Sequence, residues 1–587
     1  MSDKLNNSQI DTFDTIQLNT DESKPSSFVK KVLILKNVVK SSFNKFRRSF
    51  ASHCDSSLLA KILDKLYFSI IKCHLKVAGT FLLAFSLVSM FVGYISNRNL
   101  FSYLTNINNF GSLIIFVISL IFLTSKRSLG DILTSSRLFS DVSIVYNQIG
   151  VLDPDSTAKK SNDSYLTAFF AGVLCGIISI FYPSATLGLF VLALVLVILI
   201  LNRPECGLLM TLFISPFFSE ASAICLMFIT FISLLYKFLR GKRHIDLGVT
   251  ELLIILSGVY VLFRGLYPSS GYFNYGTTVK YLCLFMTAIV TISLIRTTSM
   301  LRRTVSVIMS LTRIYVLMLT LYYILCVIFD AQTINIYLSN VLLSGVYDSL
   351  TSANYVVPIL SMAIPLHFAH LFDKNSNGKI KNSIFLILAL ICTVFFRSYV
   401  FILTVIVSCI AIVVIRKPKF ALLLIPSPAA AFGIIELCKM IPEHFIVNAQ
   451  TPQPQNTDGF LNILSDHHAF GIGICEHLPV NMNSSSVHLL LSIGIIGVIL
   501  VLIPLAFMFF TTSKFVFNKD HNADRAKVYA SGLVCSAVSF LVTSSITNPL
   551  SDFRVSALFV TILSLSYISG RCFDADYIVP DTVREHK

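Results

Sequence analysis

The sequence has no tryptophan and few charged residues. Only 13 % of its 587 residues are Asp, Glu, Lys or Arg, whereas 55 % are hydrophobic and the mean hydropathy is +0.75. A soluble chain of this length could not bury that much apolar side chain and still cover its surface with polar groups, so the composition excludes a water-soluble protein. Without tryptophan, we expect tyrosine to supply the ring anchors at the membrane surface.

Other patterns are missing as well. No GxxxxGK[ST] loop is present, which argues against an ATP-driven pump on a single chain, and the alternation of a membrane β-barrel is absent. The 13 cysteines are scattered and lack metal-ligand spacing, so we expect no disulfide framework, no metal and no other cofactor; one bridge between Cys438 and Cys475 stays open. The polar first 30 residues lack the apolar core of a cleavable signal peptide, and we expect none.

Long apolar runs recur from Val77 to Gly570. A membrane span needs roughly 20 apolar residues, and its backbone groups must be satisfied within the segment, so these runs are predicted to be helices. The fold class is therefore all-α, a polytopic membrane helix bundle over residues 77–570 with about 14–17 transmembrane segments. The range is wide because 109–124 and 206–216 are short and could be interfacial or re-entrant. The predicted segments are 77–96, 109–124, 165–182, 184–201, 206–216, 221–239, 247–263, 281–295, 304–329, 353–372, 384–396, 399–415, 420–437, 487–511, 528–546 and 555–570.

The net charge of +15 comes from 46 Lys and Arg against 31 Asp and Glu. Most of the basic residues fall on one side of the predicted topology, so the charge orients the chain by the positive-inside rule and does not indicate nucleic acid. We expect a multi-pass protein of the cell inner (cytoplasmic) membrane, in contact with membrane lipids, with both termini cytoplasmic. One long extracytoplasmic loop is predicted over 438–486, and a cytoplasmic tail over 571–587.

The predicted cytoplasmic N-terminal region covers residues 1–76. Its first 27 residues have a composition typical of disorder. Two basic, amphipathic stretches follow within 28–75, in which Lys and Arg alternate with Leu, Ile and Phe. They are predicted either to lie on the anionic inner leaflet or to form a helical hairpin that packs on the membrane domain.

Six basic residues are predicted to face outward, against the topological bias. Arg264 and Lys280 flank a short outer loop, and Arg397 sits on the tight turn between two spans. Guanidinium groups bind phosphate oxygens in bidentate fashion, so a cluster of these three is predicted to hold a pyrophosphate at the outer bilayer surface. Contacts with lipid phosphate or water at helix ends are the open alternative. The six are Arg98, Arg264, Lys280, Arg397, Lys439 and Arg554.

Two further sets of polar residues bear on function. Arg313 lies about ten residues into its helix and is predicted to face the bundle interior, because a charge in lipid is costly. The outer loop carries acidic and histidine side chains that either include a general base or are simply solvated. They are Asp458, Asp466, His467, His468, Glu476 and His477. The Gly-Ile-Gly at 471–473 is predicted to mark a turn.

The loop and the helix after it carry a family resemblance. The run DHHAFGIGICEH at 466–477, followed by SSSVHLLLSIGIIGVILVL at 484–502, resembles the outer loop and following helix of the bacterial O-antigen ligase/polymerase superfamily. Ser-Ala-Asn-Tyr at 352–355, Phe-Phe-Arg-Ser-Tyr at 395–399 and Thr-Val-Lys-Tyr-Leu at 278–282 are similar to three further pieces of that family. The resemblance covers residues 200–570 and implies a C-type membrane glycosyltransferase-like fold.

This resemblance also implies an activity. It is the transfer of glycan repeat units from a polyprenyl-pyrophosphate carrier to an acceptor glycan or glycolipid on the outer face of the membrane, in cell-surface polysaccharide synthesis. A base would deprotonate the acceptor hydroxyl, and Arg397 would stabilise the leaving pyrophosphate. We expect Arg264, Lys280, Asn483, His477 and Asp458 to contact substrate.

The chain departs from the family at two positions. Asn483 stands where the family has a histidine, and His488 lies five residues further on, about 140° away around a helix. The family's loop arginine is missing near 457–460. The predicted base is therefore His488, with His477 or an acid as alternatives. Two other functions stay open, a transporter or flippase of lipid-linked glycans and a non-catalytic membrane scaffold.

Overall fold

The structure, a computed structural model, consists of helices throughout the part of the chain that it describes. It describes residues 57–97, 107–125, 127–128, 165–179, 181, 184–215, 217–240, 248–268, 275–296, 298–329, 344–373, 378–395, 399–416, 465–474, 484–517, 524–545 and 547–572. These ranges contain no strand; their only β-type contact is an isolated bridge between His74 and Ser128. An all-α chain is what apolar runs in lipid require, because a helix satisfies its own backbone.

The helices follow one another as α3 Leu58–Lys72, α4 Leu75–Asn97, α6 Ile107–Thr124, α9 Tyr165–Ile178, α10 Ser184–Asn202, α11 Pro204–Ile214, α12 Glu220–Leu239, α13 Val249–Leu266, α14 Tyr275–Leu294, α15 Thr298–Phe329, α17 Ser344–Thr351, α18 Ala353–Leu371, α19 Lys379–Phe395, α20 Tyr399–Arg416, α23 Ser485–Phe517, α24 Asp524–Ser544 and α25 Phe553–Cys572, with a short 3-10 turn at Pro549–Ser551. Nine helices in the described ranges are long and apolar enough to cross a membrane, and five shorter apolar helices accompany them. The predicted polytopic membrane protein is confirmed at this level.

The predicted segments agree with the helices in place but not always in extent. Helix α14 begins at Tyr275, six residues before the predicted start, so Lys280 lies inside a helix and not on the loop before it. Arg264 likewise lies inside α13, which ends at Leu266. Both differences arise because these helix ends are polar or basic yet remain helical through contacts with neighbours. The predicted segment 420–437 and most of the loop 438–486 fall outside the described residues.

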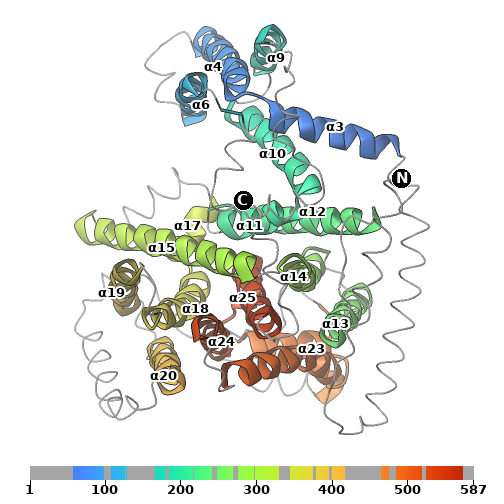
Figure 1. The fold of residues 1–587 in the computed structure, drawn as a ribbon, viewed down its shortest axis with the longest axis vertical. Coiled ribbons are helices and arrows are strands. Elements are labelled where there is room, and N and C mark those ends of the chain that lie inside the picture. Colours follow the sequence, from blue (N-terminus) through green and yellow to red (C-terminus); the bar gives the residue numbers. More distant parts are fainter. Residues whose placement is uncertain are drawn as a thin grey trace, which may run out of the picture.

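Helix α25 is the centre of the main bundle. It packs against α14, α23, α24, α15, α12 and α18, and 94 % of its span is buried (Figure 1). Its buried face carries hydroxyl side chains such as Ser556, Thr561 and Ser569, which donate to backbone carbonyls of α25 or of the turn before it. Small hydroxyl residues let helix backbones approach closely while their polar atoms stay satisfied in lipid.

The N-terminal helices form a separate group. Helix α4 packs against α6 and α9, and Figure 1 shows the three together at one end of the molecule. Gly172 and Gly176, a GxxxG pair on α9, face α4 so closely that added side chains would clash with Phe81 and Val88. Helix α10 joins this group to the main bundle, because it contacts both α6 and α12.

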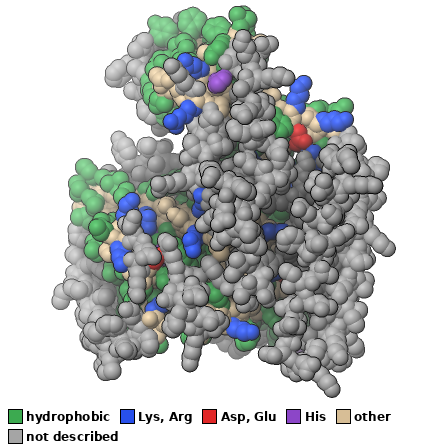
Figure 2. Space-filling view, viewed as in Figure 1, with side chains coloured by type: hydrophobic (Ala, Val, Ile, Leu, Met, Phe, Trp, Pro, Cys, Tyr) green, Lys and Arg blue, Asp and Glu red, His purple; other side chains and the backbone are tan. Residues whose placement is uncertain are grey.

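Large apolar side chains remain on the surface of the described helices. Phe181 is 79 % exposed, Phe510 71 % and Leu166 71 %. Figure 2 shows apolar side chains over the outside of the N-terminal group and along the edge of the main bundle. Exposed apolar side chains of this size fit a surface that contacts lipid.

Candidate functional site

Helix α23 is interrupted near its start. Gly494 has φ 69° and ψ 179°, a conformation that divides the helix into residues 485–493 and 495–517. Glycine is required there, because a Cβ would clash with the carbonyl oxygen of Ala469 and the positive φ is strained for other residues. The break lies at the end of the bundle where α13 ends and α23 and α25 begin, which we call the site end.

A short loop, residues 465–474, fills this break. Backbone hydrogen bonds of 2.8 to 3.2 Å run in both directions between the loop and the two halves of α23. The amides of Ile472 and Gly473 donate to the carbonyls of Leu491 and Ser492, and the amides of Ile495 and Ile496 donate to the carbonyls of His468 and Ala469. The backbone groups released by the break are thus satisfied. The Gly-Ile-Gly predicted as a turn is also the segment that inserts into the helix.

Arg264 holds this loop in place. It is 7 % exposed, and its Nη2 donates to the carbonyl oxygen of Gly471 at 2.8 Å while Nη1 donates to that of Tyr267 at 3.3 Å. The Nε atom is buried and has no hydrogen-bond partner. Sequence reasoning placed Arg264 on phosphate; the geometry shows a guanidinium whose Nη atoms bind backbone carbonyls of the loop.

His488 lies in the first turn of α23, facing α14. Its Nδ1 is 3.4 Å from the hydroxyl of Tyr281 and 3.5 Å from Oγ of Ser492. The Ser492 hydroxyl donates its proton to the His488 carbonyl at 2.7 Å, so towards the ring it is an acceptor. The Tyr281 hydroxyl can donate to Nδ1 or accept from it, so the two contacts are compatible with both neutral tautomers of His488.

Lys280 lies one residue before Tyr281 on α14 and bridges three helix ends. Its Nζ forms an ion pair with Glu220, the first residue of α12, at 2.8 Å and also donates to the carbonyl of Ser551. Glu220 in turn accepts the amide of Phe553, the first residue of α25, at 2.6 Å. Lys280 is therefore an internal tie at the site end, with its side chain 18 % exposed.

Arg554, also among the cations predicted to face outward, lies in this region as well. Its guanidinium pairs with Asp552 through Nε and Nη2, with a shortest distance of 2.6 Å, and Nη1 donates to the carbonyl of Phe218 at 3.1 Å. The guanidinium also lies 4.6 Å from the ring centre of Tyr355 on α18. Lys280 and Arg554 thus each have a carboxylate partner, whereas Arg264 donates to backbone carbonyls.

An apolar cavity of about 310 Å³ lies directly beneath these polar residues. It runs between α13, α14, α23, α24 and α25, from Ser485 and Tyr281 at the site end down to Met508. Nearly all of its lining is aliphatic or aromatic, with a few hydroxyls including Ser492 and Ser564. We call this cavity the internal groove. Its shape suits an extended hydrocarbon chain with a polar end group.

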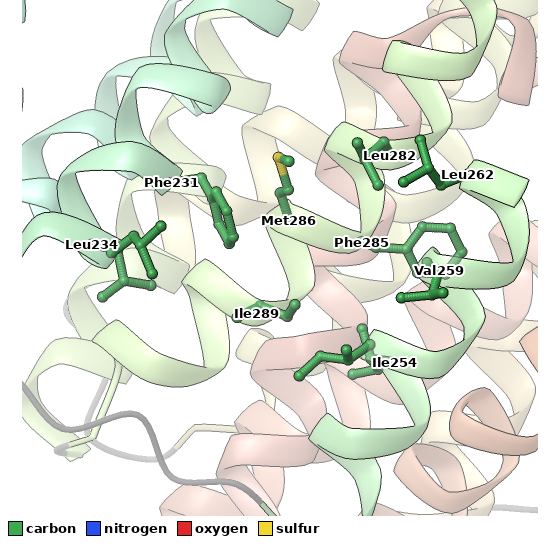
Figure 3. A pocket seen from close by; sticks show the side chains of 12 residues that line it. Phe231, Leu234, Ile254, Val259, Leu262, Leu282, Phe285, Met286 and Ile289 are labelled. Atoms are coloured by element: carbon green, nitrogen blue, oxygen red, sulfur yellow. The ribbon is translucent and has the colours of Figure 1, made fainter. Parts of the chain in front are cut away.

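A second groove of about 280 Å³ lies on the outer flank of the same helices. It runs between α12, α13 and α14 and has a wholly apolar lining, shown in Figure 3. Two residues, Ile254 and Phe285, line both grooves. Phe285 lies against Gly258, where a Cβ would be 3.4 Å from the Phe285 Cβ.

The structure brings together some of the predicted site residues. His488, Lys280 and Arg264 lie on α23, α14 and α13, which all meet at the internal groove. Arg397, Asp458, His477 and Asn483 lie outside the described residues, as do Arg98, Lys439 and Glu476. Sequence reasoning missed Tyr281 and Glu220, whose partners are far away in the chain and leave no local signal. It also missed Asp552, although its partner Arg554 is only two residues away.

Arg313 faces the bundle interior, as predicted, and belongs to a buried polar network. Its Nη2 donates to Oδ1 of Asn382 at 2.7 Å, and the same oxygen lies 3.1 Å from Nδ1 of His367. Nε2 of His367 is 2.9 Å from the Thr312 hydroxyl. His367 is fully buried and stacks on Phe385. A network of this kind within apolar helices is a second place where function can reside.

Among the described residues, no three His, Cys, Asp or Glu side chains gather in a way that could hold a metal ion. No protein-family model, curated protein or solved structure matches the chain. Fold and site together define a polytopic helical membrane protein whose interrupted helix and polar end cluster lie over an apolar internal groove.

Proposed function

We propose that the protein transfers or polymerises glycan units from a polyprenyl-pyrophosphate carrier onto an acceptor glycan or glycolipid. The reaction takes place at the outer face of the cytoplasmic membrane, with both chain termini in the cytoplasm. The observation that carries this proposal is the internal groove, an apolar cavity within the helix bundle whose lining includes Tyr281 and Ser492, the two residues whose hydroxyls lie beside His488. A ligand that fits it has a long hydrocarbon tail and a polar head, as a polyprenyl-linked glycan does.

The tail of the donor occupies the groove, and its pyrophosphate lies at the site end. Lys280 is the cation best placed to meet that pyrophosphate, since its Nζ is already at the surface of the polar cluster and its side chain is partly exposed. The donor's phosphates then compete with Glu220 for Lys280. Arg264 acts by fixing the loop 465–474 and not by binding phosphate, because its Nη atoms are engaged by carbonyls.

His488 is proposed as the base. With the proton on Nδ1, Nε2 takes the proton from an acceptor hydroxyl. The acceptor oxygen forms a bond with the anomeric carbon of the donor sugar as the bond from that carbon to the pyrophosphate oxygen breaks. The electron pair leaves with the pyrophosphate, and Arg397 is proposed to stabilise its charge. The product is a glycan longer by the transferred unit and a free polyprenyl pyrophosphate.

The test is glycan transfer by purified protein in nanodiscs, with a lipid-linked donor and a fluorescent acceptor glycan. Replacing His488 by Ala is expected to lower the transfer rate by about 100-fold or more, as for loss of a general base. Replacing Arg397 by Ala is expected to have a similar effect. The matched control is His467→Ala, since His467 is an exposed histidine of the neighbouring loop whose side chain is not part of the His488 cluster. Full activity of His488→Ala would rule out the base.

A second function, transport of lipid-linked glycans across the membrane, is supported by one observation. The Arg313, Asn382 and His367 network places an ionisable group inside the bundle, as transport pathways often do. The same nanodisc preparation separates the two functions, because transfer lengthens the acceptor, whereas transport only moves the donor and requires sealed vesicles. If neither glycan transfer nor donor transport were observed, the remaining function would be that of a non-catalytic membrane scaffold.

A further inference from the structure

Helix α3 lies where several membrane-spanning helices end. Its last residue, Lys72, is three positions before Leu75, where α4 begins. Tyr67 and Ile71 pack against Ile198, near the end of α10. These contacts place the C-terminal half of α3 at the ends of two other apolar helices.

The middle of α3 is tied to a third helix end. Asp64 forms a two-oxygen ion pair with Arg240, the residue directly after α12, at 2.9 and 3.1 Å. The side chain of Arg240 is 5 % exposed. A helix of 15 residues is about 22 Å long, and contacts along it reach three helix ends. Helix α3 therefore runs across those ends, along the surface of the membrane rather than through it.

The face of α3 turned away from these contacts is apolar. Leu58 is 74 % exposed, Ile62 47 % and Leu66 44 %. At 100° per residue, these three lie within an arc of about 80°, while the buried Ala60 and Tyr67 lie on the opposite side. In the part of the chain that the structure describes, no side chain covers this stripe.

Lysines border the stripe on one side. Lys61 and Lys65 are exposed and fall about 60° and 20°, respectively, from Leu58 around the helix. Figure 2 shows basic side chains beside apolar ones over α3. An apolar stripe with an adjacent row of cations is the pattern of a helix that sinks its apolar side into a bilayer and holds lipid phosphates with its lysines.

We propose that α3 is a binding surface for anionic phospholipids, with Leu58, Ile62 and Leu66 inserted at the headgroup boundary and Lys61 and Lys65 on the lipid phosphates. The charge of the helix selects this occupant over the chain's own residues 28–50, which are themselves strongly basic and would be repelled by the lysines. The inference does not depend on the proposed glycan transfer.

The absence of tryptophan provides the test, because one introduced tryptophan is a unique fluorophore. The full-length Ile62→Trp protein is placed in nanodiscs of phosphatidylcholine with phosphatidylglycerol, with brominated lipids as quenchers. Bromines near the headgroup are expected to quench more strongly than bromines deep in the chains, since the helix lies about 5–10 Å into the boundary. Tyr67→Trp, on the buried face, is the matched control and is expected to be quenched far less.

Headgroup preference tests the lysines. Energy transfer from the tryptophan to dansyl-labelled phosphatidylglycerol is expected to exceed transfer to dansyl-labelled phosphatidylcholine. The double change Lys61→Gln and Lys65→Gln is expected to lower that preference by roughly fivefold for each lysine. Equal preference before and after the change would overturn the anionic-lipid assignment.

Two other results would also overturn the inference. Absence of quenching at Ile62→Trp by any brominated lipid would show that the stripe is not in the bilayer. Quenching that appears only after deletion of residues 1–56 would show that the chain's own N-terminal segment covers the stripe. Correct folding of each variant is checked by its elution and helical signal in detergent.

Discussion

The Nη2 atom of Arg264 donates to the carbonyl oxygen of Gly471 at 2.8 Å, and this bond joins residues 207 positions apart. It fixes the loop that pairs with both halves of the broken helix α23. A cation expected to bind substrate phosphate thus maintains the backbone geometry beneath the substrate site. Its removal affects His488 only through the loop and helix between them.

Arg264→Lys is expected to loosen the loop while retaining the charge. The single Nζ of a lysine does not reproduce the two separate Nη positions that reach Gly471 and Tyr267, and a hydrogen bond from a charged group contributes about 1.5–3 kcal/mol. Hydrogen exchange at the amides of Ile472 and Gly473 should accelerate by roughly 10- to 100-fold. The control is Arg302→Lys, an exposed arginine on α15, for which exchange in the loop should not change.

Gly494→Ala is expected to destabilise the protein. The positive φ costs about 1–2 kcal/mol for a residue with a side chain, and the added Cβ clashes with the Ala469 carbonyl. The temperature of thermal unfolding in detergent, followed by circular dichroism, should fall. Gly258→Ala is the matched control within a helix. Its Cβ would lie at ordinary contact distance from Phe285, so stability should stay the same or rise.

Exchanging the two charges, as Glu220→Lys together with Lys280→Glu, is not expected to restore the stability of the original protein. Glu220 accepts both Lys280 and the amide of Phe553, and a lysine at position 220 could not accept that amide. Glu220→Gln keeps an acceptor and should cost less stability than Glu220→Lys. In a double-mutant cycle measured by unfolding in SDS, the coupling of the two charges should be below about 1 kcal/mol, because both are partly exposed. A stable Glu220→Lys, Lys280→Glu protein would contradict this account.

Asn382→Leu is expected to lower the free energy of unfolding by about 1–3 kcal/mol, since one oxygen serves both Arg313 and His367 inside the bundle. Asn382→Asp retains that oxygen and adds a charge opposite to Arg313, so it should be tolerated better. The comparison is made by unfolding in SDS. If Asn382→Leu and Asn382→Asp lowered the free energy of unfolding equally, the shared oxygen of Asn382 would not stabilise the protein.

The membrane class and the positions of the helices could be predicted from the sequence, because hydropathy over a span is a local property. Helix ends were less well predicted. The polar first turns of α14 carry Lys280, which hydropathy alone assigns to a loop, yet its partner Glu220 keeps it within a packed helix end. The inward orientation of Arg313 followed from the cost of a charge in lipid.

The insertion of the loop 465–474 into the break of α23 at Gly494 was not predicted. The sequence does contain two glycine motifs, GIG at 471–473 and GIIG at 494–497, on either side of a polar stretch. This pairing is the one signal from which the insertion could have been found. What the sequence cannot give is which carbonyls the loop amides meet, since these lie about 20 residues away and depend on the fold. The same holds for Tyr281, which meets His488 only when α14 and α23 pack together.

The interrupted helix also has a consequence for biogenesis. The loop 465–474 leaves the ribosome before α23, yet its amides are needed by carbonyls at 491 and 492. Until α23 has been synthesised, the amides of Ile472 and Gly473 have no helix carbonyls to donate to, and hydrocarbon does not tolerate such unsatisfied backbone groups. Loop and helix must therefore complete their insertion as one unit, and a ribosome stalled between them would leave the membrane with an unfinished span.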